Sequence, residues 1–470
     1  MAASQRMSHA DAAWLHMDRP TNLMVITGVL WFDQSPDWDG VRETIRERMV
    51  EPFPRFRQRV VEGVGPLSGP HWEDDPTFDL DLHIHRVQLP APGDRDALQA
   101  YVADLMATPL DRSQPLWQFH LVDGYGDGAA IVSRIHHCIA DGIALGRVLL
   151  SLTDEAPDAG IAPSADEADT SGRGGGMGGL ARPAASAVSV ARDAAEAVAH
   201  EAIEVGRRPS RLRELAENAR ADAETLAKLL FKPPDPQTPL KGELGIARRV
   251  AWSAPLPLEA VKTIGHWSGT TVNDVLMTAV AGSLHHYLRG RDAEVDELTA
   301  MVPFNLRPLD QPLPPDLGNR FGLVYLPLPV GIGEIRGRLE EVHRRMDEIK
   351  HSSEGALSYG LLDAIGRTPP QVEKVLVDLF TAKGSAVITN VPGPRQPVYM
   401  AGTPVSGVLV WAPCSGGVSM SVSIFSYAGQ VTLGVMTDAG LVPDPERITE
   451  RFEPELISLA REAAGKASPA

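Results

Sequence analysis

The chain is interrupted about a third of the way along by residues that cannot build a hydrophobic core. Residues 156–185 are mostly Ala, Gly, Asp, Ser and Pro, a composition that predicts a disordered linker. The Ala-, Glu- and Arg-rich residues 186–230 then predict helix. Since 470 residues are enough for two domains, we expect three segments: an N-terminal half at 1–155, a linker at 156–235 that is disordered and then helical, and a C-terminal half at 236–470.

The helical part of this linker leaves two interpretations open. Its helices could be solvated, or docked on the rest of the protein. Alternatively, they could touch lipid through an apolar group flanked by two lysines, which comprises Leu226, Leu229, Leu230, Phe231, Lys228 and Lys232.

Both halves mix helical and strand-like hydrophobic patterns. In the first half we expect strands at 25–32, 80–89, 116–122 and 129–135, and helices at 38–50 and 94–107. In the second we expect helices at 258–267, 272–288 and 335–349, and strands at 298–304 and 322–328. The last two of the first-half strands would form a hairpin. The pattern predicts an α/β (α+β mixed) protein of two domains.

Residues 396–437 contain no charged side chain, which raises the question of a membrane span. A spanning helix needs about 20 mainly apolar residues. This stretch is instead broken by prolines and glycines and is rich in Ser, Val and Thr. It therefore predicts several buried strands joined by turns.

Charge and cysteine content narrow the partners and the compartment. The formal net charge of −17 argues against nucleic acid as a partner. The two cysteines, Cys138 and Cys414, cannot form a disulfide framework, which suits a reducing compartment. The first 18 residues show no apolar core of a secretory signal. We expect a cytoplasmic protein that is soluble or peripheral to a membrane.

The strongest chemical signal is the sequence His136-His137-Cys138-Ile139-Ala140-Asp141-Gly142, which reads HHxxxDG. It follows an apolar, strand-like run and precedes a helix-like run. A histidine at the end of a strand, before a turn and a helix N-terminus, is well placed to meet a substrate. Imidazole is the side chain best matched to removing a proton from an alcohol or amine near neutral pH.

Three other interpretations of this motif remain open. The histidines could belong to a packed core. They could bind a metal, although neighbours in a strand point to opposite faces and no HExxH or CxxC spacing is present. Cys138 could be a nucleophile, although its base rarely comes from the adjacent residue.

The motif and several other segments resemble one family, the bacterial wax ester synthases/diacylglycerol acyltransferases. HHxxxDG itself is shared with peptide condensation domains and with other acyltransferases of the chloramphenicol acetyltransferase-like fold. The further segments that carry the resemblance are 11–15, 20–22, 54–57, Pro115-Leu116-Trp117, Asn273-Asp274, Leu306-Arg307-Pro308, 317–319, 390–394 and 441–445. Together they run nearly end to end in the family's order.

The resemblance implies two chloramphenicol acetyltransferase-like domains that form a tunnel at their interface. The implied reaction is transfer of a long-chain acyl group from acyl-CoA to a fatty alcohol or a diacylglycerol, which gives wax ester or triacylglycerol. No cofactor or metal is needed, and the insoluble substrates imply contact with a membrane or lipid inclusion surface. Two alternatives stay open: condensation on carrier-bound or amine substrates, and a catalytically silent lipid-binding protein.

Within this interpretation, His137 is the general base and no acyl-enzyme forms. Strand alternation places His136 on the opposite face, where we expect it to support the loop. Asp141 is expected to cap the following helix and to pair with an arginine, and the layout of plant acyl-CoA-dependent acyltransferases points to Arg307. Gly142 is expected to allow close backbone approach or a positive φ.

The remaining candidates are predicted to contact substrate, and each has a structural alternative. Leu116 and Trp117 would line the acyl tunnel or else pack in the core. Asn273 would help to bind substrate or the oxyanion, unless it and Asp274 only cap their helix, for which Thr271 is the expected N-cap. Asn390 is a further candidate for the oxyanion region.

Overall fold

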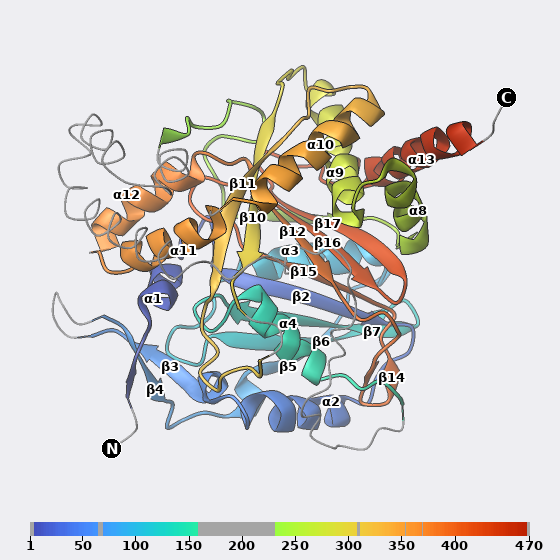
Figure 1. Ribbon diagram of the computed structural model, residues 1–470. Helices are drawn as coiled ribbons and strands as arrows, with labels where there is room; N and C mark the ends of the chain where they lie inside the picture. The colour runs from blue at the N-terminus through green and yellow to red at the C-terminus, as the bar shows by residue number, and fades with distance from the viewer. Residues whose placement is uncertain are drawn as a thin grey trace.

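The computed structural model describes residues 4–63, 69–157, 231–307, 311–352, 354–368 and 370–467. Two β-sheets dominate it (Figure 1). The first sheet has the strand order β15-β2-β7-β6-β5. In chain order its members are β2 (Val25–Phe32), β5 (Ile84–Gln88), β6 (Trp117–Tyr125), β7 (Gly128–His136) and β15 (Gly407–Trp411).

The second sheet is built from the C-terminal half and has the order β11-β10-β12-β16-β17-β8, with β9 paired to β17. Its strands are β8 (Arg248–Trp252), β9 (Leu256–Pro257), β10 (Leu298–Asn305), β11 (Phe321–Leu328), β12 (Ala386–Pro392), β16 (Met420–Tyr427) and β17 (Gln430–Asp438). The uncharged stretch supplies strands of both sheets, as well as β13 (Tyr399–Met400) and β14 (Thr403–Pro404). The prediction of buried strands for this stretch is confirmed.

Helices surround the two sheets. The N-terminal half contributes α1 (His9–His16), α2 (Trp38–Ile45), α3 (Arg95–Met106) and α4 (Gly142–Ser151). The C-terminal half contributes α8 (Leu258–Ser268), α9 (Val272–Arg289), α10 (Ile335–Lys350), α11 (Glu354–Ile365), α12 (Pro370–Thr381) and α13 (Glu446–Ala467). A small sheet of β1 (Gln5–Arg6), β4 (His71–Asp74) and β3 (Gln58–Val61) lies beside the first sheet.

Most predicted elements are present, and two differ locally. The predicted hairpin is β6 and β7, which pair antiparallel. The predicted helix at 38–50 changes from α-helix to π-helix at Arg46–Val50. The predicted strand at 80–89 is wrong at its start, because Leu80–Leu82 forms a 3-10 turn, in which the N–H of Asp81 donates to the side chain of the N-cap Asp79. The turn removes these residues from the ladder of β5.

The two halves are not separated as cleanly as the predicted boundaries suggest. Strand β15, which we assigned to the C-terminal half, pairs antiparallel with β2 and completes the first sheet. In return, α1 of the N-terminal half packs against α11 of the C-terminal half (Figure 1). Sequence periodicity assigns a strand but not its sheet, because it carries no information about distant pairing partners.

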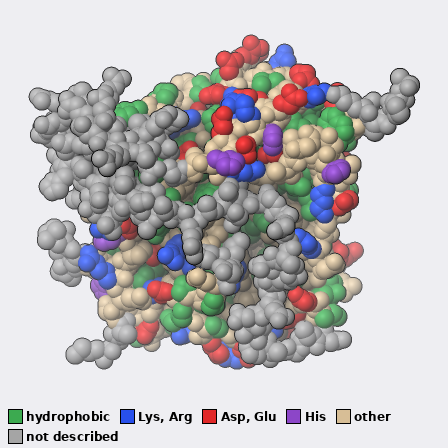
Figure 2. All heavy atoms as spheres, in the orientation of Figure 1, with side chains coloured by type: hydrophobic (Ala, Val, Ile, Leu, Met, Phe, Trp, Pro, Cys, Tyr) green, Lys and Arg blue, Asp and Glu red, His purple; other side chains and the backbone are tan. Residues whose placement is uncertain are grey.

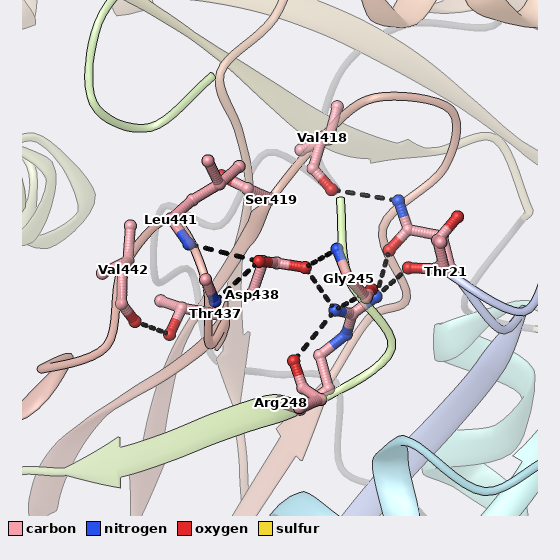
Figure 3. A network of polar contacts seen from close by, with 12 residues as sticks. Thr21, Gly245, Arg248, Val418, Ser419, Thr437, Asp438, Leu441 and Val442 are labelled. Atoms are coloured by element: carbon pink, nitrogen blue, oxygen red, sulfur yellow. Dashed lines mark hydrogen bonds and ion pairs between the residues drawn. The ribbon is translucent and has the colours of Figure 1, made fainter. Parts of the chain in front are cut away.

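A buried polar network ties the N-terminal segment to the second sheet (Figure 3). Arg248 on β8 donates from Nη1 to Oδ2 of Asp438 on β17 at 2.9 Å, and both side chains are at most 5% exposed. The Nη2 of Arg248 donates to the carbonyl of Thr21 and to Oδ1 of Asn22, the latter at 3.2 Å. Asn22 Nδ2 donates in turn to the carbonyl of Val418 at 3.0 Å. The entry of the chain into β2 is therefore fixed by the C-terminal half.

The surface of the protein and the predicted linker can also be compared with the sequence predictions. Acidic and basic side chains alternate over α10 (Figure 2), where Arg336 pairs with Glu340, so this part of the surface is not a basic one. No helix in the described ranges is long and apolar enough to cross a membrane. Most of the predicted linker, with Leu226, Lys228, Leu229 and Leu230, lies outside the described residues. Of its candidate lipid-contact residues, Phe231 and Lys232 are described, and Phe231 is exposed.

Candidate active site

The HHxxxDG sequence forms the connection between β7 and α4. Strand β7 is buried along its whole length and ends at His136. The backbone N–H of His136 donates to the carbonyl of Leu116 at 2.9 Å, and that of His137 donates to the carbonyl of Met24 at 2.7 Å. Asp141 is the N-cap of α4, and its Oδ1 accepts from the N–H of Ala144 at 2.8 Å. The predicted cap is confirmed.

A loop of the C-terminal half clasps this connection. Oδ2 of Asp141 accepts from Nη2 of Arg307 at 3.2 Å and from the backbone N–H of Arg320 at 2.9 Å. Arg307 also donates to the carbonyls of Leu317 and Gly318, and the N–H of Gly318 donates to the carbonyl of Ile139 at 3.1 Å. The contact between Asp141 and Arg307 that the resemblance implied is present. The loop conformation therefore depends on both halves.

A second polar chain reaches His137 through Asn319. Its Nδ2 donates to the carbonyl of His137 at 2.8 Å and to Oδ1 of Asp11 at 2.7 Å. Asp11 is 6% exposed, and burial raises the pKa of its carboxyl to about 6 against the hydrogen bonds from Ser8 and Asn319. The sequence segments that contain Asp11 and Asn319 supported the resemblance, but we assigned neither residue a role. The signal that could have identified Asp11 is that it is the single charged residue in the otherwise apolar residues 10–15.

The ring of His137 is enclosed by aromatic side chains. It stacks on Trp14 with ring centroids 4.1 Å apart and an interplanar angle of 15°, and it lies 5.2 Å from the ring of Phe321. Its Nδ1 is buried and has no hydrogen-bond partner within the described residues. Burial lowers the pKa of His137 to about 4, although its own backbone carbonyl and the charge of Asp141 act in the other direction. The imidazole is therefore neutral at physiological pH, the form that accepts a proton.

His136 has different neighbours and supports the loop. Its Nδ1 accepts from the N–H of Cys138 at 3.1 Å, and its Nε2 lies 3.8 Å from Oδ2 of Asp18. Because β7 ends at His136, His137 lies in the turn, so strand alternation is not what separates the two rings. Within the described ranges, no group of three or more His, Cys, Asp or Glu residues is arranged to hold a metal ion. Burial raises the pKa of the Cys138 thiol, which disfavours a thiolate nucleophile.

The prediction for Gly142 is wrong. It is the first residue of α4 and is exposed, and its φ is not positive. A Cβ placed on it would meet no heavy atom within 4 Å. Neither backbone strain nor close packing explains this glycine, because the first turn of the helix faces open space here.

An apolar pocket lies directly beside His137. It has about 640 Å³ of space not filled by atoms, open solvent at its mouth included, and Trp14 and Phe321, which both contact the His137 ring, form part of its wall. The other lining residues come mainly from α11, α12, β10 and β11 and are Met17, Met301, Gly322, Leu323, Tyr325, Ser358, Leu361, Leu362, Ile365, Val377, Phe380, Thr381 and Ser415.

Three of the four hydroxyl groups in the pocket wall are already bonded to the protein. Ser358 donates to the carbonyl of Gly355, Tyr325 donates to the carbonyl of Phe380, and Thr381 donates to the carbonyl of Val377. The wall therefore offers mostly apolar surface, which suits a hydrocarbon chain.

Leu116 and Trp117 pack in the core, and neither lines this pocket. Trp117 is fully buried, stacks on His83 at 4.5 Å and donates from Nε1 to the carbonyl of Phe56 at 2.9 Å. Of the two interpretations, core packing is what the structure shows, and the lining of an acyl tunnel stays a prediction. The ring of Trp117 contacts aromatic side chains of its own half, Phe56, His83 and Phe119.

The structure brings Asn273 and Asn390 together. Asn390 Nδ2 donates to Oδ1 of Asn273 at 2.7 Å. Asp274 forms a capping box with Thr271 and also accepts from Nδ1 of His343 at 2.8 Å. Capping is therefore confirmed for Asp274 and for the N-cap Thr271. None of these residues lines the pocket beside His137, and the substrate-binding roles of Asn273 and Asn390 stay predictions.

Solved structures show which class of fold this is. The first condensation domain of the calcium-dependent antibiotic synthetase matches with a TM-score of 0.60 and 16% identity over 99% of this chain and 97% of that domain. The wax ester synthase/diacylglycerol acyltransferase from Marinobacter aquaeolei VT8 matches with a TM-score of 0.68 and 23% identity over 98% of this chain and 100% of that one. The chain therefore has the two-domain fold of condensation-type acyltransferases.

Sequence comparison defines the family within this class. The wax ester synthase/diacylglycerol acyltransferase catalytic domain matches residues 7–276, and the C-terminal domain of the same family matches residues 317–460. The probable diacylglycerol O-acyltransferase tgs1 of Mycobacterium tuberculosis is 29% identical over 96% of this chain and 94% of its own length. A putative diacylglycerol O-acyltransferase of Mycobacterium bovis matches equally well. The chain belongs to the wax ester synthase/diacylglycerol acyltransferase family and is an acyltransferase.

Proposed function

We propose that the protein transfers a long-chain acyl group from acyl-CoA to the hydroxyl of a diacylglycerol or a fatty alcohol, which yields triacylglycerol or wax ester. The observation that carries this proposal is a neutral, buried imidazole whose ring packs against Trp14 and Phe321, two side chains that line an apolar pocket. The imidazole suits proton removal from a hydroxyl, and the pocket suits one of two apolar substrates. The relatives described above are named for the diacylglycerol reaction, which supports diacylglycerol as the acceptor.

In the proposed mechanism His137 is the general base. It takes the proton of the acceptor hydroxyl while the oxygen attacks the thioester carbonyl, and a tetrahedral oxyanion forms. The oxyanion collapses, the carbon–sulfur bond breaks, and the imidazolium returns the proton to the sulfur of coenzyme A. No acyl-enzyme and no cofactor are needed. General acid–base catalysis contributes roughly 10²–10⁴-fold, so positioning of the two substrates supplies much of the rest.

The substrates are proposed to meet in a tunnel between the halves. The pocket beside His137 supports this, because its wall combines Trp14 and Met17 of the N-terminal half with residues of α11 and α12. Since both substrates are poorly soluble, we propose a cytoplasmic enzyme that works at the surface of a membrane or lipid inclusion. The two free, buried cysteines suit that reducing compartment.

The test is release of coenzyme A thiol from palmitoyl-CoA by the purified protein. The assay is run with hexadecanol, with dipalmitoylglycerol and with neither, alongside His137→Ala. We expect release that depends on the acceptor and falls by at least about 10²-fold in the variant. The better acceptor decides between wax ester and triacylglycerol synthesis. The matched control is His286→Gln, a half-exposed histidine paired with Glu455 on the far helix α13.

Two outcomes would contradict the proposal. A His137→Ala variant with unchanged turnover would remove this residue from the role of base. Absence of acceptor-dependent thiol release from the wild type would redirect attention to amine acceptors and carrier-bound donors, for which the condensation-domain fold is a precedent. Acyl-chain binding without any turnover would instead support a silent lipid-binding protein.

A further inference from the structure

We propose that Trp14 is a further residue of the acyl-transfer site, and that its indole N–H donates a hydrogen bond to the thioester carbonyl oxygen as that oxygen becomes an oxyanion. This inference rests on the proposed function. It adds a donor that neither the sequence motifs nor the predicted oxyanion candidates, Asn273 and Asn390, supplied.

The first observation is where Trp14 lies. It belongs to α1, is 5% exposed, and covers one face of the His137 ring at 4.1 Å in a nearly parallel stack. It also forms part of the wall of the apolar pocket. Trp14 therefore contacts both the proposed base and the space in which we place an acyl chain. Phe321, whose ring is 5.4 Å from that of Trp14, completes the enclosure.

The second observation is that the indole N–H is unused. Nε1 of Trp14 is buried and has no hydrogen-bond partner within the described residues. A buried tryptophan N–H usually finds a partner, as Nε1 of Trp117 and of Trp38 do here. An unsatisfied buried donor lowers stability. The unpaired N–H of Trp14 destabilises the free protein and lies on a residue that contacts the proposed base. It is therefore a candidate donor to a bound substrate.

The geometry of the reaction gives this donor a purpose. The acceptor hydroxyl must lie at the edge of the imidazole, in the plane of the ring, and the carbonyl that it attacks must lie next to it. The nearly parallel stack, with ring centroids 4.1 Å apart, holds the indole next to the imidazole, and the proposal places the thioester carbonyl oxygen at the indole N–H. When the new oxygen–carbon bond forms, the carbonyl π electrons move onto this oxygen, and the hydrogen bond stabilises the charge. The indole keeps its proton throughout.

Three of the four hydroxyl residues that line the pocket are poor candidates for this role. Ser358, Tyr325 and Thr381 each donate to a backbone carbonyl of the protein. Their rotation towards a substrate would leave that carbonyl unpaired. The N–H of Trp14 loses no such partner when it binds a substrate oxygen.

The test is Trp14→Phe, assayed by acceptor-dependent thiol release. The substitution keeps an aromatic ring against His137 and removes the N–H. We expect kcat to fall by about 10²-fold, the typical loss for one oxyanion donor. KM should change little, because the hydrogen bond forms in the transition state. The thermal midpoint should fall, because the smaller ring leaves a cavity beside His137.

The matched control is Trp72→Phe. Nε1 of Trp72 is also buried without a partner, but this residue lies on β4 and does not line the pocket. We expect it to leave kcat unchanged. To separate loss of the N–H from a packing defect, a second variant replaces Trp14 with benzothienylalanine, which keeps the bicyclic shape and has sulfur in place of N–H. It should show the same loss of kcat as Trp14→Phe.

Several results would overturn the proposal. If both Trp14 variants turn over within about threefold of the wild type, the N–H has no catalytic role and Trp14 is only a wall of the pocket. If Trp14→Phe is slow but the benzothienyl variant is normal, shape alone matters. A wild type without acceptor-dependent release would overturn the proposed function itself, together with this inference, and is recognised before any variant is compared.

Discussion

Two arginines of the C-terminal half, Arg307 and Arg248, make similar contacts in different places. Each is buried against one aspartate and also donates to backbone carbonyls. Arg307 reaches across to Asp141 of the HHxxxDG loop, while Arg248 pairs with Asp438 of its own sheet and reaches across to the carbonyl of Thr21. The first pair holds the HHxxxDG loop, and the second fixes how the chain enters β2. Two buried ion pairs with similar partners can therefore have different roles, which depend on the segment of chain that each pair holds in place.

The largest effects are expected from breaking the Asp141–Arg307 pair. Asp141→Asn and Arg307→Gln should each lower the free energy of unfolding by about 3–5 kcal/mol, because one buried charge remains without its partner. Thiol release should fall in both, since the loop that carries His137 loses its clasp. Chemical denaturation of the single and double variants measures the coupling. Losses that simply add in the double variant would show that the two groups do not act together.

The other pair should separate stability from activity. Arg248→Gln should destabilise the fold by a similar amount, about 3 kcal/mol. Turnover per folded molecule should stay within about twofold of the wild type, because the pair does not contact the loop. Arg249→Gln, an exposed neighbour on the same strand, is the matched control and should change neither quantity. If Arg248→Gln lowers kcat as strongly as Arg307→Gln, the two pairs do not differ in function.

Asp11 is a third buried aspartate and provides a sharper contrast, because it has no ion pair within the described residues. Burial raises its pKa to about 6, so the folded state favours the neutral acid. Asp11→Asn should therefore be more stable than the wild type above pH 6, by up to about 3 kcal/mol for a shift of about two units. The difference should shrink as the pH falls through 6 towards 3.8, where the wild-type carboxyl becomes protonated in both states. Thermal unfolding between pH 4 and 8 measures this, and a constant difference would contradict it.

The smallest change is expected in the pH dependence of catalysis. Because the pKa of His137 is lowered to about 4, the proposed base stays neutral when the pH is reduced from 8 to 5. The value of kcat/KM should thus remain within about twofold over this range, whereas a histidine with an ordinary pKa of about 6.5 would already lose most of its activity. Asp11 titrates in this range, but one of its oxygens can still accept from Asn319. A tenfold fall between pH 7 and 5 would contradict the burial of the base.

Local sequence patterns predicted the HHxxxDG loop, but they could not predict contacts between residues far apart in the chain. HHxxxDG, with an apolar run before it and a helix after it, placed the strand, the turn and the cap by Asp141. The resemblance supplied Arg307. Asp11 and Asn319 were missed, because they meet across 308 residues of chain and hydrophobic periodicity reports only near neighbours. We gave Trp117 a possible substrate-binding role, because the sequence pattern of an aromatic residue in a strand does not distinguish a core position from a tunnel wall.

The pairing of β15 with β2 has a consequence for how the protein is made. Synthesis proceeds from the N-terminus, so β2 emerges hundreds of residues before its partner at Gly407–Trp411. Until then one edge of an apolar strand is unpaired, and such edges recruit other chains. Arg307, Asn319 and Arg320, whose contacts hold the HHxxxDG loop, are also synthesised late. A nascent chain therefore carries an unpaired apolar strand edge and an incompletely held HHxxxDG loop through most of its translation, and the proposed site is completed as one of the last events of its synthesis.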